Sequence, residues 1–211
     1  MMQRVALYGG SFNPIHVGHL ISARAIAEHL GLDRVIFLPS ARPPHKPASE
    51  ALDAMHRAEM VKLAIEGEPG FEFSDYDLTR SGPTYTIDTV RHFSNLLGAQ
   101  TTLYWIIGAD SLPELGTWHR IHELLDSCTM ITAMRPGIPV PDVQSLRSAL
   151  GDERLARLLS GRVCTPAIEI SSTDIRDRVR RGRSVRYSVP HSVLEYIHRH
   201  GLYRAPHSEP R

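Results

Sequence analysis

The sequence is poor in cysteine and in long hydrophobic runs. Its two cysteines, Cys128 and Cys164, show neither a CxxC motif nor the ligand spacing of a structural zinc site. We therefore exclude a disulfide scaffold and expect free thiols in a reducing cytosol. No apolar run approaches the roughly 18 residues of a membrane-spanning helix, and the N-terminus lacks the apolar region of a secretory signal. We expect a cytoplasmic protein that does not bind membranes.

Lysine and net charge are scarce as well. Of 24 basic residues only Lys46 and Lys62 are lysines, and 23 acidic residues bring the formal net charge to +1. A chain with this balance lacks the excess of positive charge that would attract nucleic acid or an anionic membrane surface. Any site for an anion must therefore be built locally.

Short apolar runs alternate with segments of helical periodicity along the 211 residues. Strands are predicted at 5–8, 35–38, 71–74, 103–107, 130–134 and 168–170. Helices are predicted at 19–30, 55–65, 87–97, 121–125 and 143–159. This alternation is typical of a doubly wound, Rossmann-like, mostly parallel α/β sheet with helices on both faces. Ligands of such folds bind at the carboxyl ends of the strands.

We divide the chain into an α/β domain at 1–170, a small helical extension at 171–204 and a charged tail at 205–211. We expect the extension to pack on the domain. The proline-rich stretch at 136–141 is interpreted as a connecting loop, because the periodic pattern resumes after it without a shift in composition.

The first motif, GGSFNPIHVGH at 9–19, directly follows the first predicted strand and opens the first helix. Gly9 and Gly10 let the backbone approach a bound group closely, and the helix start offers unpaired N–H groups to an anion. His16 and His19 are three residues apart, so both rings can face that anion. Two other interpretations stay open: a turn with surface histidines, or a metal pair, for which no third ligand is evident.

This motif resembles the H-x-G-H signature of the nucleotidyltransferase superfamily, and its full form resembles the bacterial nicotinate mononucleotide adenylyltransferases. It is neither the Rossmann G-x-G-x-x-G nor the P-loop motif. The resemblance covers nearly the whole chain and is weakest at 139–161. It implies an enzyme of NAD biosynthesis that joins ATP to nicotinate mononucleotide, giving nicotinate adenine dinucleotide and pyrophosphate.

A second motif, Pro43-Pro44-His45-Lys46, follows the second predicted strand. Consecutive prolines keep a loop extended, so His45 and Lys46 can be presented to an anion at little ordering cost. Ordinary surface basicity is the alternative. The same family carries PPHK at this place, which implies a contact with the mononucleotide.

A third motif, SSTDIR at 171–176, follows the last predicted strand. Its hydroxyls can simply cap a helix, but together with Arg176 they can also build a phosphate site. The pattern resembles the second ATP signature of the family, so the extension is expected to complete the ATP site. The remaining arginines among the eight between residues 171 and 204 are assigned to a solvated face.

Two middle segments resemble the parts of the family that recognise the nicotinate half. Trp118 can stack on a flat ring, Asp110 can accept from ribose hydroxyls, and the amide of His119 can donate to a carboxylate. Taken singly, Trp118 is more readily a core residue and Thr86 a helix cap. Taken together, SGPTYT at 81–86, GADS at 108–111 and the Thr117-Trp118 pair after it match the family pattern.

Three sets of site residues follow from the resemblance. The catalytic set is His16, His19, Lys46 and Arg176. The ATP set is Gly9, Gly10, Ser11, Phe12, His16, His19, Gly108, Asp110, Ser171, Ser172, Thr173 and Arg176. The nicotinate mononucleotide set is Asn13, His45, Lys46, Tyr85, Thr86, Asp110, Trp118 and His119. The expected cofactor is Mg²⁺, held by phosphates without a protein ligand.

Because the mononucleotide phosphate is already a nucleophile, the expected mechanism needs alignment and charge neutralisation but no base. Rival hypotheses are a pantetheine-phosphate adenylyltransferase of the same superfamily and a nucleotide sensor without catalysis. A tRNA-charging enzyme would need a lysine-containing second signature and a longer chain. The sequence leaves open the oligomeric state, a homodimer included, and the strictness of nicotinate over nicotinamide.

Overall fold

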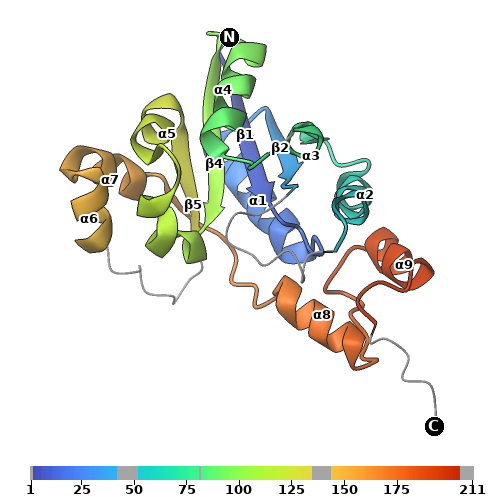
Figure 1. Cartoon of the computed structure of the whole chain (residues 1–211). Coiled ribbons are helices and arrows are strands. Elements are labelled where there is room, and N and C mark those ends of the chain that lie inside the picture. The colour runs from blue at the N-terminus through green and yellow to red at the C-terminus, as the bar shows by residue number, and fades with distance from the viewer. Residues whose placement is uncertain (1, 42–51, 81, 135–143, 205–211) are drawn as a thin grey trace.

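A parallel sheet forms the centre of the protein (Figure 1). The computed structural model describes residues 2–41, 52–80, 82–134 and 144–204. Within these ranges the sheet has six strands in the order β3-β2-β1-β4-β5-β6. They are β1 (Gln3–Gly10), β2 (Arg34–Pro39), β3 (Phe71–Phe73), β4 (Thr101–Gly108), β5 (Thr129–Met134) and β6 (Arg162–Cys164). The order reverses between β1 and β4, and ligands of doubly wound sheets bind at such a switch point.

Helices cover both faces of the sheet (Figure 1). The helices in the described ranges are α1 (Val17–Leu30), α2 (Ala54–Ile65), α3 (Tyr76–Thr79), α4 (Thr86–Leu97), the 3₁₀ helix η2 (Ala109–Thr117), α5 (Ile121–Ser127), α6 (Gln144–Leu150), α7 (Asp152–Ser160), α8 (Ser172–Arg180) and α9 (His191–Arg199). None of the helices in the described ranges is long and apolar enough to cross a membrane.

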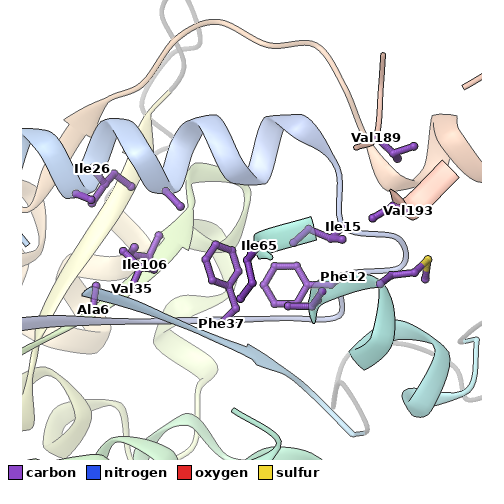
Figure 2. Packing of buried hydrophobic residues seen from close by; sticks show 14 of the residues in the cluster. Ala6, Phe12, Ile15, Ile26, Val35, Phe37, Ile65, Ile106, Val189 and Val193 are labelled. Atoms are coloured by element: carbon purple, nitrogen blue, oxygen red, sulfur yellow. The ribbon is translucent and has the colours of Figure 1, made fainter. Parts of the chain in front are cut away.

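Alternate residues of β1, β2, β4 and β5 belong to two separate hydrophobic cores, as expected for strands buried on both faces. Ala6 of β1 belongs to the core under α1 and α2, whereas Val5 and Leu7 belong to the core under α4, α5 and α7. Figure 2 shows the first core, in which Phe12 and Ile15 of the loop after β1 pack beside Phe37 of β2. This loop is therefore anchored by apolar side chains before it reaches α1.

The helical extension shares that first core. Ile175 of α8 and Val193 and Ile197 of α9 are all buried in it, and α9 lies against α2 (Figure 1). Ser192 Oγ also donates a hydrogen bond of 2.9 Å to the carbonyl of Leu63. The extension is thus packed on the sheet domain.

The doubly wound α/β class is confirmed, but two predicted elements were wrong. The last strand is β6, not 168–170, because Ile170 packs on the first core and Ile168 lies beside the start of α1 without pairing to a strand. The predicted helix at 143–159 is two helices, since Gly151 between them has φ +78°. The short helices α3 and η2 were missed. The loop at 136–141 lies outside the described residues.

Candidate active site

A cavity of about 1130 Å³ lies at the carboxyl ends of β1 and β4, at the switch point of the sheet. Its walls come from the loops that follow these strands, from the starts of α1, α4 and α8, and from η2 and the residues after it. Both tryptophans of the chain, Trp105 and Trp118, line it. Segments far apart in the sequence thus meet at one place.

Most of the predicted site residues line this cavity. They are Gly9, Gly10, Ser11, Phe12, His16, His19, Tyr85, Thr86, Gly108, Asp110, Trp118, His119, Ser171, Ser172 and Thr173. Asn13 and Arg176 do not line it. His45 and Lys46 lie outside the described residues.

The loop after β1 is held in a tight conformation. A Cβ atom on Gly9 would lie 2.5 Å from Cζ2 of the buried Trp105 side chain, so only glycine fits there. Phe12 adopts φ +43°, which a bulky residue holds only when its surroundings enforce it. Its ring packs edge-on against Tyr8 and His19, with centroids 5.6 and 5.2 Å away. The loop is thereby fixed against the wall of the cavity.

His16 and His19 act as a pair at the start of α1. Their rings stack with centroids 3.7 Å apart, and the amide of His16 donates a hydrogen bond of 3.2 Å to His19 Nδ1. Because Nδ1 of His19 accepts this bond, the neutral ring carries its proton on Nε2 and can donate it to an anion. A Cβ atom on Gly18 would lie 3.0 Å from His16 Nδ1, so the glycine between the histidines makes room for this stacking.

A second helix start faces the same cavity. Ser171 caps α8, since its Oγ accepts the amide of Asp174 at 3.0 Å. Ser172 Oγ donates 2.9 Å to the carbonyl of Pro14 in the loop after β1. The N-termini of α1 and α8 therefore contribute two positive dipole ends to one site, which suits a chain of phosphates.

Arg176 and Asn13 lie behind the cavity wall. Arg176 Nη1 donates 2.9 Å to the Asn13 carbonyl, and Nη2 donates 3.2 Å to Thr173 Oγ1. The Asn13 side chain accepts a hydrogen bond from Tyr203. These residues join the extension to the loop after β1.

The other end of the cavity is aromatic. The rings of Tyr85 and His119 stack with centroids 4.1 Å apart, and Trp118 lines the cavity beside them. Thr86 is the first residue of α4, so a third helix N-terminus points to this region. Flat aromatic walls beside a helix start suit a planar ring that carries a negative group.

Two buried charged residues were missed. Asp77 of α3 lines the cavity at 4% exposure and accepts a hydrogen bond of 2.6 Å from Thr89. Burial raises the pKa of the Asp77 carboxyl, while Thr89 and Arg80 act in the opposite direction. Arg57 of α2 is 1% exposed beneath the loops after β1 and β2. No sequence signal separates these side chains from the exposed charges of an ordinary helix.

The metal-pair interpretation of His16 and His19 finds no third ligand here. Among the described residues, no group of three or more His, Cys, Asp or Glu side chains is arranged to hold a metal ion.

Cys128 is half-buried, and burial raises the pKa of its thiol to about 12, so the thiol stays protonated.

Comparisons with known proteins agree with this geometry. The model of the cytidylyltransferase-like family matches residues 7–178. A probable nicotinate-nucleotide adenylyltransferase of Thermoanaerobacter sp. (strain X514) is 40% identical over 205 residues, covering 95% of this chain and 94% of the relative. Its counterpart in Thermus thermophilus is 42% identical over 201 residues, covering 95% and 100%.

A solved structure has the same fold at low identity. It is described as Plasmodium falciparum nicotinic acid mononucleotide adenylyltransferase complexed with NaAD. The TM-score is 0.73 at 17% identity, over 95% of this chain and 97% of that chain.

Proposed function

The chain belongs to the cytidylyltransferase-like family, and we infer that it transfers the adenylyl group of ATP to nicotinate mononucleotide in NAD biosynthesis. The products are nicotinate adenine dinucleotide and pyrophosphate. The observation that carries this conclusion is the single cavity in which most of the predicted residues meet. At about 1130 Å³ it exceeds the usual pocket for one small ligand, about 300–1,000 Å³, and has room for two nucleotides.

We place the ATP phosphates between the starts of α1 and α8. Residues 171–173 at the start of α8 line the cavity, and so do His16 and His19 at the start of α1. Gly9 and Gly10 form the adjoining wall, with little side-chain bulk. Backbone N–H groups at the start of α8 and the Nε2–H of His19 can donate to phosphate oxygens.

The nicotinate half is placed at the aromatic end. Trp118 and Tyr85 provide flat surfaces for the pyridine ring, and the start of α4 at Thr86 faces the same region. A carboxylate on that ring would lie in the favourable field of a helix N-terminus. Asp110, between the two ends, is placed to accept from ribose hydroxyls.

In the proposed reaction, an oxygen of the mononucleotide phosphate attacks the α-phosphorus of ATP. A new P–O bond forms while the bond from the α-phosphorus to the bridging oxygen breaks, and pyrophosphate takes the electron pair. No proton must be removed from the nucleophile, so catalysis consists of in-line alignment and neutralisation of the charge that spreads over the phosphorus. His19 donates through Nε2, and the two helix starts add their dipoles.

We further propose that Mg²⁺ accompanies ATP and is held by phosphate oxygens and water, the ligands this ion prefers in nucleotide sites. The starts of α1 and α8 fit such a phosphate chain, since they present His19 Nε2–H and the backbone N–H groups of a helix N-terminus. The ion would supply additional neutralisation of the phosphate charge.

The contacts of His45, Lys46 and Arg176 with substrate remain proposals. Arg176 is engaged with the Asn13 carbonyl, so a contact with ATP would come from its remaining N–H groups or after this bond breaks. The cytoplasmic location and a homodimer likewise remain expectations from the sequence.

The test is pyrophosphate release by purified protein with ATP and Mg²⁺, comparing nicotinate mononucleotide, nicotinamide mononucleotide and phosphopantetheine. Strong preference for nicotinate mononucleotide is expected. Preference for phosphopantetheine would move the chain to another branch of the superfamily. No release with any of the three would support a nucleotide sensor.

A further inference from the structure

Arg57 is a charged side chain in the interior of the protein. It lies on α2, is 1% exposed, and faces away from solvent under the loops that follow β1 and β2. Burial lowers the pKa of its guanidinium, with Tyr203 and Asp53 acting in the opposite direction. Within the described part of the chain, its hydrogen bonds do not reach the side chains of His16, His19 or Arg176.

Among the described residues, Arg57 has four hydrogen-bond acceptors, and each is a main-chain carbonyl. Nη1 donates 2.7 Å to Ser11, and Nε donates 3.0 Å to Leu52. Nη2 donates 2.8 Å to Ser40 and 3.3 Å to Ala41. One guanidinium thus joins three separate stretches of backbone.

Two of these stretches form the wall of the cavity. Ser11 and Ser40 both line it, one after β1 and the other after β2. They are also linked directly, because the Ser40 amide donates 2.9 Å to the Gly10 carbonyl. The separation of the two loops is therefore fixed twice, by the hydrogen bonds of Arg57 to both loops and by the direct Ser40–Gly10 bond.

A buried charge is an expensive way to hold a core together. Apolar side chains of similar volume are often as stabilising or more so, because the charge must be removed from water. What the guanidinium adds is direction, since its planar fork carries five donors at fixed angles. A lysine at this place keeps the charge, but its three donors share one nitrogen and cannot reproduce the spacing of Nε, Nη1 and Nη2.

We propose that Arg57 is a positioning residue for adenylyl transfer, which holds the loops at Ser11 and Ser40 at the separation that aligns the reacting phosphates. It acts through the backbone of these loops and does not touch the substrates. The inference rests on the proposed function, and it adds a role for a residue of α2 that lies outside the phosphate site.

The test compares Arg57→Lys with the wild-type chain under saturating ATP and nicotinate mononucleotide. We expect kcat per folded protein to fall about 10- to 10²-fold, the effect of a small misplacement of reacting groups, with little change in either KM. Arg57→Gln is the second variant, because it leaves no unpaired buried charge and can fold where the lysine variant does not. The folded fraction is measured by circular dichroism at the assay temperature.

The control is Arg4→Lys, which replaces an arginine that donates to Tyr104 near the amino ends of the central strands β1 and β4, away from the cavity at their carboxyl ends. It should keep wild-type kcat. A second readout is coupling to His19: when His19→Ala has already removed that donor, Arg57→Lys should lower kcat by a smaller factor. If Arg57 had only a structural role, Arg57→Lys would lower the melting temperature. It would then leave kcat per folded protein unchanged, both in the wild-type chain and in His19→Ala.

The outcomes separate this inference from the function on which it rests. An inactive wild-type chain would refute the proposed function. An active wild-type chain with unchanged kcat in a folded Arg57 variant would refute the positioning role alone. Failure of both variants to fold would also refute it, by showing that Arg57 serves stability.

Discussion

Tyr203 and Asn13 lie 190 positions apart in the sequence and are joined by a hydrogen bond of 2.8 Å, from the phenol oxygen to Asn13 Oδ1. Burial raises the pKa of the Tyr203 hydroxyl, so it keeps its proton and donates. With the bonds from Arg176 to Asn13 and from Ser172 to Pro14, it ties the C-terminal extension to the loop that carries His16. The extension is therefore part of the support of the active site.

Tyr203→Phe should weaken this support. The variant lacks the hydroxyl that donates to the buried Asn13 side chain, and losing this bond costs about 1 kcal/mol of stability. The melting temperature should therefore fall by about 2–4 °C, and kcat should fall with it. Calorimetry and steady-state kinetics measure both. Tyr187→Phe is the control, since that side chain is 81% exposed. An unchanged melting temperature and unchanged kcat in Tyr203→Phe would show that the bond has no role.

Gly9→Ala should disturb the loop after β1, because the added methyl group would clash with Trp105. The added methyl would lie 2.5 Å from the indole, and overpacking of this kind costs about 1–3 kcal/mol. We expect lower stability and lower activity. The double variant Gly9→Ala with Trp105→Phe should recover part of both losses, because the smaller ring leaves space. Equal losses in the single and double variants would refute the steric explanation.

Trp118→Ala should weaken the binding of one substrate and not of the other. If the indole stacks on the pyridine ring, its loss raises KM for nicotinate mononucleotide about tenfold, the equivalent of an aromatic contact of about 1.4 kcal/mol. KM for ATP should change little. A larger rise in KM for ATP would place the adenine at the aromatic end and reverse our assignment.

Asp77→Asn should change how stability depends on pH. Because burial raises the folded-state pKa of this carboxyl above its unfolded value, the folded protein holds the proton more tightly, and stability falls as pH rises through that window. Asparagine can still accept from Thr89 and has no charge to bury. We expect the variant to melt about 2–4 °C higher than wild type near pH 7, with the difference vanishing below about pH 4. A variant that melts lower at pH 7 would show that the ion pair with Arg80 outweighs burial.

The sequence predicted the sheet and the residues that line the cavity better than the side chains that hold the cavity loops in place. Apolar runs identified β1, β2, β4 and β5, and β3 was predicted as well, whereas β6 was missed because its sequence Arg162-Val163-Cys164 forms no apolar run. Gly9 and His16 were found because their motif is local and follows a strand. Arg57 was not found, because its burial depends on loops that fold over α2 from other parts of the chain. Arg176 was assigned to ATP, while the structure engages it with Asn13.

The most direct test of the account is the turnover of His19→Ala with saturating ATP, Mg²⁺ and nicotinate mononucleotide. Its control is His29→Ala at the exposed far end of α1, which should keep wild-type activity. If the cavity between α1 and α8 performs the transfer, loss of the His19 donor should lower kcat about 10²- to 10³-fold while the protein stays folded. Near wild-type turnover of folded His19→Ala would contradict the account.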